Sequence, residues 1–222
     1  MDRLGIIVGM QSEARLARRL QPAAIEISGA TLEGAKQAVE RLSRASVDGI
    51  ISFGFAAGLD PLLKPGTILI PHSIHVQGQD YTADHRLRLR LGAENSSVKV
   101  GALLQSDKIV VSSKEKFSLF QQTSCVAVDM ESGIVARYCH AQNIPFAVLR
   151  VICDSAKRDL PPLACMALSQ QGGLNINKML GSIFSQPSQL SSLICLGAEA
   201  TFAHWRLDRF LEKFQTENYI YS

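Results

Sequence analysis

The chain has 222 residues, of which 46% are hydrophobic, and its 23 basic and 20 acidic side chains give a formal net charge of +3 at pH 7. This length suits one α/β domain or at most two small ones, and the apolar fraction excludes disordered, collagen-like and low-complexity classes. The nearly neutral charge argues against a dedicated nucleic-acid-binding protein, because such proteins concentrate basic side chains.

Cysteines and apolar segments predict a location. The five cysteines are odd in number and form no C-x-x-C pair, so neither a disulfide framework nor a zinc site is expected. The apolar run near the amino terminus, residues 4–8, is too short for a signal peptide. No stretch approaches the ~18 to 20 apolar residues that span a bilayer. We therefore expect a cytoplasmic protein that holds no metal.

Short apolar runs bounded by Gly, Pro or Asp predict strands that are buried on both faces. These runs cover residues 4–8, 49–53, 67–70, 98–104, 125–128 and 146–153. Segments with helical composition or spacing lie between them, at residues 11–20, 31–44 and 132–142. The alternation predicts an α/β fold with a largely parallel core.

Two further segments, residues 64–66 and 84–91, have a predictable local structure. Lys64-Pro65-Gly66 fits a type II turn. Residues 84–91 alternate arginine with leucine, which fits either an edge strand or a helix capped by Asp84, and a solvated basic face is favoured over an anion site.

From residue 181 the sequence changes character and predicts a helical extension. We therefore divide the chain into a body of residues 1–180 and an extension of residues 181–222 packed on the same domain. Packing on the body or on a second subunit is favoured over peripheral membrane contact. Such contact would use the basic side chains Arg206, Arg209 and Lys213.

Three places combine a predicted strand with polar or small residues at its carboxyl end, where open α/β sheets bind ligands. The first strand runs through Gly9 into Glu13 at a helix start, which favours anions or allows a carboxylate to orient water. A first-turn charge favoured by the helix dipole is the alternative explanation of Glu13. The second place, around Phe55 and Ala56, has small residues that let the backbone approach a ligand, although tight packing also explains them.

The third place is the sharpest signal in the chain. Asp129 and Glu131 flank Met130 after one predicted strand, and Asp154 ends another. Because burying a charge is costly unless it is paired, carboxylates at the ends of two neighbouring strands are seldom there for packing alone.

Four segments in this order resemble the nucleoside phosphorylase and nucleosidase superfamily: GIIVGMQSEA, SFGFAAGLDPLLKPGTILIP, VAVDMES and RVICDSA. The resemblance covers roughly residues 4–162, and the interval of 23 residues from Glu131 to Asp154 fits the methylthioadenosine/S-adenosylhomocysteine nucleosidases. It implies a three-layer α-β-α sandwich with a mixed, largely parallel sheet, and cleavage of the N-glycosidic bond of a purine nucleoside.

A narrower resemblance is to the hopanoid-associated phosphorylases, which are thought to remove adenine from adenosylhopane. The segments that carry it are GMQSEARLARR, FGFAAGLDP, DMESGIVAR, CDSAKRDLPP and, in the extension, QPSQLSSLICLGAEA. This resemblance implies a 5′-substituted adenosine, lipid-linked in hopanoid biosynthesis, as the substrate.

The superfamily resemblance assigns roles to individual residues. Asp154 corresponds to the general acid that protonates N7 of the base, and burial would have to raise its pKa. Glu131 corresponds to the ribose-binding glutamate, whose charge favours a cationic sugar in the transition state. Met130 would pack beneath the sugar, and Ile109 and Val110 would flank the base. Substrate contacts are also expected from Asp129, Phe55, Ala56, Gly9 and Arg150.

The acceptor of the sugar is the open point of this interpretation. Glu13 matches the position that activates water in the nucleosidases, whereas phosphorolysis needs several arginines around an anion. The aligned segments offer only three such arginines, Arg15, Arg18 and Arg150. Phe55 stands where the superfamily often has Ser or Thr, and Ala57 replaces a customary Gly. We therefore favour hydrolysis without a cofactor and keep phosphate as the alternative co-substrate.

Two further interpretations stay open. The chain could be a methylthioadenosine/S-adenosylhomocysteine or futalosine nucleosidase, or a non-catalytic nucleoside-binding protein on the same fold. The carboxylates of Glu13, Glu131 and Asp154 argue against the latter, because binding alone does not require all three. The resemblance also implies a homodimer, with a small-molecule nucleoside and no nucleic acid as its partner.

Overall fold

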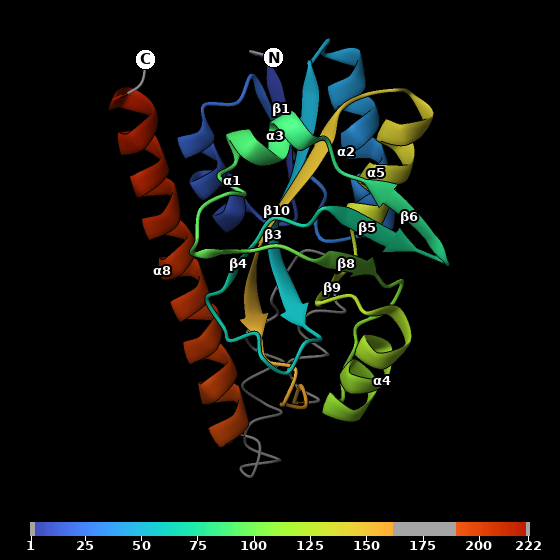
Figure 1. Ribbon diagram of the computed structural model, residues 1–222, viewed down its shortest axis with the longest axis vertical. Helices are drawn as coiled ribbons and strands as arrows, with labels where there is room; N and C mark the ends of the chain where they lie inside the picture. The colour runs from blue at the N-terminus through green and yellow to red at the C-terminus, as the bar shows by residue number, and fades with distance from the viewer. Residues whose placement is uncertain (1–2, 162–189, 221–222) are drawn as a thin grey trace.

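A computed structural model describes residues 3–161 and 190–220 of the chain. In this part of the chain ten strands form one mixed sheet with helices on both faces (Figure 1). The strands are β1 Leu4–Val8, β2 Ala24–Ile27, β3 Gly49–Gly58, β4 Ile68–Leu69, β5 Ser73–Val76, β6 Gln79–Thr82, β7 Val98–Lys99, β8 Ala102–Gln105, β9 Ala127–Asp129 and β10 Phe146–Asp154. The helices are α1 Gln11–Ala17, a 3-10 turn at Arg18–Leu20, α2 Leu32–Arg44, α3 His85–Arg90, α4 Ser113–Thr123, α5 Ser132–Ala141 and α8 Leu190–Ile220.

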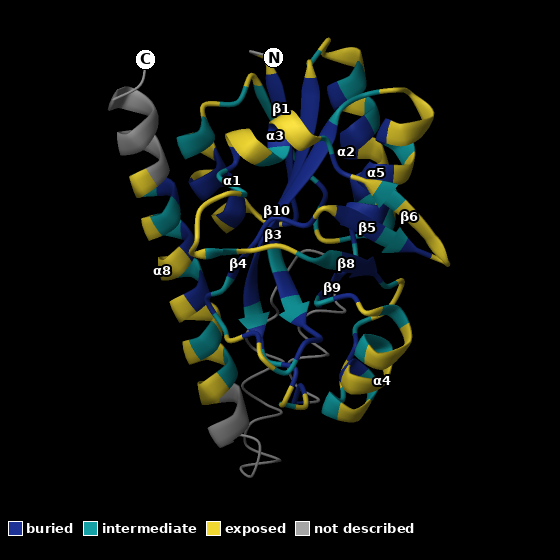
Figure 2. Ribbon diagram, viewed as in Figure 1, coloured by how far each residue is buried: buried dark blue, intermediate teal, exposed yellow. Residues whose placement is uncertain are grey.

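The two faces of the sheet are covered by different helices, as the predicted three-layer α-β-α sandwich requires. Helices α2 and α5 bury apolar side chains such as Val39 and Val135 against one face. Helices α1, α3 and α8 bury Leu16, Leu87 and Leu207 against the other. The buried colouring of the central strands in Figure 2 follows from this double cover, because side chains alternate between the two faces of a strand.

Strand β3 organises the part of the sheet that carries the site. It pairs in parallel with β1 near its start and with β10 along most of its length, and antiparallel with β9 at its end. In the register, Ala57 of β3 lies opposite Asp154 of β10 on one side and Val128 of β9 on the other. The acidic residues expected at two neighbouring strands therefore stand on opposite sides of β3, which corrects the predicted adjacency.

Most predicted strands are confirmed, with corrected ends. The run at 49–53 continues to Gly58, so the small residues around Ala56 belong to the strand and not to a loop after it. The run at 98–104 is split, because β7 pairs with β4 whereas β8 pairs with β5 and β9, and Val100 between them is 39% exposed. The helix expected at 11–20 ends its α-helical part at Ala17.

Hydrogen bonds define the local structure of the turn at residues 64–67 and of the basic segment at residues 84–91. The Thr67 amide donates to the Lys64 carbonyl at 3.1 Å, and Gly66 has a φ of 84°, as a type II turn requires. Residues 85–90 form helix α3, and the Asp84 carboxylate accepts the Leu87 amide at 2.8 Å as its N-cap. Helix and cap replace the edge-strand alternative.

The carboxy-terminal segment is helical, as predicted, over Leu190–Ile220. Its residues Ala203, Leu207 and Leu211 are fully buried against the face formed with α1 and β10. The boundary expected at residues 180 and 181 lies outside the described residues, so the division into body and extension stays a prediction. Among the described helices, none is both long and apolar enough to cross a membrane.

Candidate active site

Glu13 is a buried carboxylate held by backbone amides. It stands in the first turn of α1, and only 4% of the residue is exposed. Its Oε2 accepts the Met10 amide at 2.8 Å and its Oε1 accepts the Phe55 amide of β3 at 3.2 Å. Burial is the largest influence on this carboxyl and raises its pKa to about 7, even though the nearby Arg150 lowers it. Glu13 is therefore suited to exchange a proton near neutrality.

Two glycines allow the chain to come this close to Glu13. A Cβ on Gly54 would lie 2.4 Å from Glu13 Oε1 and 3.0 Å from Arg150 Nη1. A Cβ on Gly9 would lie 3.1 Å from Glu13 Oε2 and 3.5 Å from both carboxylate oxygens of Glu131. Both carboxylates therefore gather over the backbone of Gly9, which explains the glycine at this predicted position.

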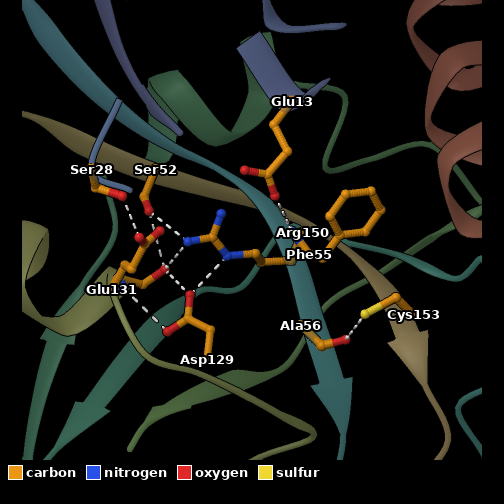
Figure 3. A network of polar contacts seen from close by, with 10 residues as sticks. Glu13, Ser28, Ser52, Phe55, Ala56, Asp129, Glu131, Arg150 and Cys153 are labelled. Carbon is orange, nitrogen blue, oxygen red and sulfur yellow. Dashed lines mark hydrogen bonds and ion pairs between the residues drawn. The ribbon is translucent and has the colours of Figure 1, made fainter. Parts of the chain in front are cut away.

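Glu131 lies next to Glu13 in the same buried region (Figure 3). It precedes α5, and its Oε1 accepts a hydrogen bond from the hydroxyl of Ser28, the residue that follows β2. Burial raises the pKa of Glu131, whereas Arg150 and the Ser28 hydroxyl lower it. The carboxylate for which the resemblance implied ribose binding is therefore well shielded from bulk water.

Arg150 of β10 lies at the centre of this network and is almost wholly buried. Its Nε donates to Asp129 Oδ2 at 2.7 Å, and its Nη2 donates to the hydroxyls of Ser52 at 2.8 Å and Ser132 at 3.0 Å. The Ser132 hydroxyl donates in turn to Asp129. Burial alone would lower the pKa of the guanidinium, but the carboxylates around it raise the pKa overall. Arg150 is therefore the permanent counter-ion of this acidic cluster.

Asp154, at the carboxyl end of β10, has a separate partner. Its Oδ2 accepts a hydrogen bond from Lys116 Nζ of α4 at 2.6 Å, and its Oδ1 is buried without a partner among the described residues. Burial raises the pKa of Asp154, and the Lys116 ammonium opposes that rise. The carboxyl is therefore more easily protonated than an ordinary aspartate, as a general acid requires.

The remaining predicted substrate residues lie around these groups. Met130 and Ile109 are half-buried, and Phe55 packs its ring partly against the apolar face shared with α1. The Ala56 carbonyl accepts the Cys153 thiol at 3.6 Å. The side chain of Val110 is buried in an apolar cluster with Leu59, Leu104, Cys125 and Val128, and its place beside a base stays a prediction. Of the pair expected to flank a base, only Ile109 keeps an accessible side chain.

The three arginines considered for a phosphate site are not gathered around an anion position. Arg15 and Arg18 are exposed, because the face of α1 that buries Glu13 turns them toward solvent. The Nε and Nη2 of Arg150 are already bound to Asp129, Ser52 and Ser132. Within the described residues, no group of three His, Cys, Asp or Glu side chains could hold a metal ion.

Comparison with known proteins shows the family of the chain. The sequence profile described as the phosphorylase superfamily matches residues 28–171, which is more than half of the chain. The chain belongs to the phosphorylase superfamily. A 5′-methylthioadenosine/S-adenosylhomocysteine nucleosidase of Buchnera aphidicola is 30% identical over 137 residues, which are 52% of this chain and 54% of that protein. The chain thus spans about half the length of the curated relatives that it matches.

Solved structures confirm the superfamily fold. A methylthioadenosine/S-adenosylhomocysteine nucleosidase of Neisseria meningitidis, in complex with methylthio-immucillin-A, has a TM-score of 0.70 and 18% identity, with 96% of this chain and 98% of that chain covered. A futalosine hydrolase mutant of Helicobacter pylori has a TM-score of 0.61 and 18% identity, with 84% and 100% covered. The three-layer fold implied by the resemblance is therefore confirmed.

For this superfamily member, the sequence did not identify several residues that hold the site together. These residues are Ser28, Ser52, Ser132 and Lys116. Single serines carry no distinguishing pattern, although Ser132 falls within the VAVDMES segment. For Lys116 the sequence offers one indication, its place in a polar stretch between residues 105–110 and the strand that ends at Asp129. Its burial could not be inferred without recognising α4.

Proposed function

We propose that this chain hydrolyses the N-glycosidic bond of a purine nucleoside and releases adenine from a 5′-substituted adenosine. The observation that carries the proposal is the division of buried acids about β3. Glu13 and Glu131 lie beside Arg150, and Asp154 stands apart with Lys116. Glycosidic cleavage needs a proton donor for the leaving base and negative charge near the sugar, and this division supplies both.

Asp154 would protonate the leaving base. As the C1′–N9 bond breaks, its electron pair moves onto the purine, and a proton passes from Asp154 Oδ1 to N7. Oδ1 supports this assignment, because among the described residues it is the oxygen of Asp154 that has no hydrogen-bond partner. Burial keeps the carboxyl protonated to a higher pH than an ordinary aspartate, which favours proton donation.

The two glutamates would bind the sugar and activate the nucleophile. Glu131 would accept hydrogen bonds from ribose hydroxyls, and its charge would stabilise the oxocarbenium-like sugar. Glu13 would take a proton from water as the water oxygen bonds to C1′. Its pKa of about 7 leaves it largely ionised at slightly alkaline pH, as a general base must be.

Hydrolysis is preferred to phosphorolysis because of the charge around Glu13. A phosphate dianion would have to approach two carboxylates, Glu13 and Glu131, while Arg15 and Arg18 point to solvent. The only buried arginine nearby, Arg150, is bound to Asp129 and two serines. A neutral water molecule pays no such electrostatic penalty.

For the 5′ substituent we propose a lipid-linked adenosine of the adenosylhopane type. The segments shared with the hopanoid-associated phosphorylases support this choice, including the one that enters α8. The methylthioadenosine/S-adenosylhomocysteine nucleosidase relatives and the futalosine hydrolase neighbour favour the soluble nucleosides as the second candidates. With a lipid-linked substrate the protein would act in the cytoplasm, as a homodimer in peripheral contact with a membrane.

The test is adenine release from a panel of nucleosides, with and without phosphate. The panel contains adenosylhopane in detergent, methylthioadenosine, S-adenosylhomocysteine and futalosine. We expect phosphate-independent base release that is fastest with adenosylhopane. Release that depends strictly on phosphate would overturn hydrolysis, and faster turnover of a soluble nucleoside would overturn the lipid-linked assignment.

A variant separates catalysis from binding alone. Asp154→Asn should lower purine release by about 10²- to 10⁴-fold, the usual contribution of a general acid. A nucleoside-binding protein without activity would show purine-dependent thermal stabilisation and no turnover in either the wild-type or the variant protein. That result on the whole panel would reject the proposed function.

A further inference from the structure

Among the described residues, Lys116 is the most deeply buried charged side chain outside the predicted site. It lies in α4, and none of its surface is exposed. Its Nζ donates to Asp154 Oδ2 at 2.6 Å, to the Ser155 carbonyl at 3.0 Å and to the Arg158 carbonyl at 2.9 Å. An ammonium group has three donors and no acceptor, so this pocket satisfies every one of them. The pocket is therefore built for a charged lysine.

The pairing makes the two oxygens of Asp154 unequal. Oδ2 is bound to Lys116, whereas Oδ1 is buried and has no partner among the described residues. We infer that Lys116 is a positioning residue for Asp154: it holds Oδ2 so that Oδ1 delivers the proton to the purine, and it stabilises the carboxylate left behind. This inference rests on the proposed function. In the step, the O–H bond of Oδ1 breaks, an N7–H bond forms, and the remaining charge faces the ammonium.

Further contacts tie α4 to the segment that follows β10. The Ser113 amide at the start of α4 donates to Asp159 Oδ1 at 2.6 Å. The Leu160 amide donates to the Val111 carbonyl at 2.9 Å. Lys116, one turn further along α4, extends the same connection to the carboxylate of Asp154. The helix thus fixes both the segment and the orientation of the acid at its start.

The charged groups around Asp154 come from three elements. Lys116 faces it from α4 and Arg158 from the following segment, and both lower its pKa; Glu199 faces it from α8 and raises the pKa. Arg158 and Glu199 are themselves paired at 3.0 Å, so their effects on Asp154 oppose each other. Hydrogen bonds from Ser113 lower the pKa of Asp159, and the Lys116 ammonium contributes less to the same lowering. Lys116 is thus the cation in direct contact with the acid.

The effect of removing the Lys116 ammonium follows from its positive charge. Without the ammonium, the protonated form of Asp154 should persist to a higher pH, because the carboxylate loses its counter-ion. Proton donation itself should become slower, since the charge left on Asp154 is no longer stabilised. A residue that only supports the fold would change the amount of folded enzyme and leave the pH profile of the folded enzyme in place.

The decisive experiment compares Lys116→Met with Lys114→Met in the full chain. Lys114 is an exposed lysine two positions away on the same helix, so it is a matched control. In Lys116→Met the alkaline limb of kcat/KM for adenine release should move up by about one pH unit or more, and kcat should fall about tenfold. Lys114→Met should change neither. An unmoved limb in folded Lys116→Met would overturn the inference.

A measurement without substrate keeps this inference separate from the proposed function. The infrared band of the protonated carboxyl is followed against pH in the wild-type protein and in Lys116→Met, with Asp154→Asn used to assign it. The band should persist to a higher pH in the lysine variant, and Lys116→Gln, which keeps a polar head, serves if the methionine variant does not fold. An unchanged band in the variant that folds rejects the inference. Absence of purine release by the wild-type protein rejects the proposed function instead.

Discussion

Two buried ionic groups lie around the end of β3, and they differ in their balance of charge. In the first group, Arg150 of β10 faces three carboxylates, those of Asp129, Glu131 and Glu13. In the second group, Lys116 and Asp154 form a one-to-one pair. The first group pairs Arg150 with Asp129 and two serines, while the second leaves Asp154 Oδ1 without a partner among the described residues.

This difference fits two different chemical tasks. An excess of buried carboxylates favours a ligand that becomes cationic, because their charge is only partly neutralised and water is excluded. A balanced pair with one free oxygen is suited to move a proton without leaving an isolated charge. Burial raises the pKa of Glu13, Glu131 and Asp154 alike, so the partners, and not burial itself, distinguish the two regions.

The largest effect should come from removing the cation of the acidic group. Arg150→Met leaves Asp129 and its neighbours without a counter-ion, and breaking a buried pair in this way typically costs about 3–5 kcal/mol of the free energy of unfolding. Urea denaturation at pH 8 measures the loss. Arg18→Met, which changes an exposed arginine, should cost little.

The loss of unfolding free energy in Arg150→Met should also depend on pH. At pH 5 it should shrink, because Glu13, whose pKa is raised to about 7, takes up a proton and no longer needs a cation. A loss of equal size at pH 5 and pH 8 would mean that packing, and not charge, holds Arg150, and the contrast between the two regions would fail.

A smaller effect is expected from Glu13→Gln, which removes one carboxylate of the same group. The pKa of Glu13 rises from 4.5 to about 7 on folding, so the wild-type fold loses stability as pH rises through about 7. The stability present below pH 4.5 and lost above pH 7 is on the order of 3 kcal/mol, and the variant should not lose it. Denaturation at pH 5 and pH 8 compares the two proteins.

Activity gives a second readout for Glu13. Wild-type kcat/KM for adenine release should fall as pH drops below about 7, where the proposed base becomes protonated. Glu13→Gln should lower it by about 10²-fold and remove this acid limb. Glu33→Gln changes an exposed glutamate in the first turn of α2 and should leave both unchanged. A retained limb in Glu13→Gln would assign the titration to another group, such as Glu131.

The sequence predicts the central sheet better than its periphery, for a physical reason. Strands β1, β3 and β10 are covered on both faces and read as continuous apolar runs. Strand β2 and the β5–β6 hairpin are partly exposed, and α4 buries Lys116, so a hydrophobic pattern does not mark them. The division of the run at 98–104 depends on pairing with distant strands, which no local pattern encodes.

The site shows the same limit. The sequence selects Glu13, Glu131 and Asp154 as candidates because their carboxylates follow apolar strands in segments that resemble the superfamily. Their partners were not identified, because a hydrogen bond such as Ser28 to Glu131 joins residues 103 positions apart. The burial of Val110 in an apolar cluster was not foreseen, because an apolar residue beside a site can equally belong to the core. Residue types thus indicated the chemistry, and the tertiary fold decided which groups control it.

The smallest effect tests whether the acidic group is tuned by neutral partners as well as by Arg150. Ser28→Ala removes the hydroxyl that donates to Glu131, so the pKa of Glu131 should rise further and its hold on ribose should weaken. A hydrogen bond to a charged group contributes about 1.5–3 kcal/mol, but Arg150 remains in place. We therefore expect KM to rise about tenfold and kcat to change less. Ser43→Ala, which removes a hydroxyl paired with Tyr138 at 2.9 Å on the opposite end of α2, is the matched control. If KM were the same in both variants, the Ser28 hydroxyl would serve only to connect β2 to the site, and Arg150 alone would control the charge of the acidic group.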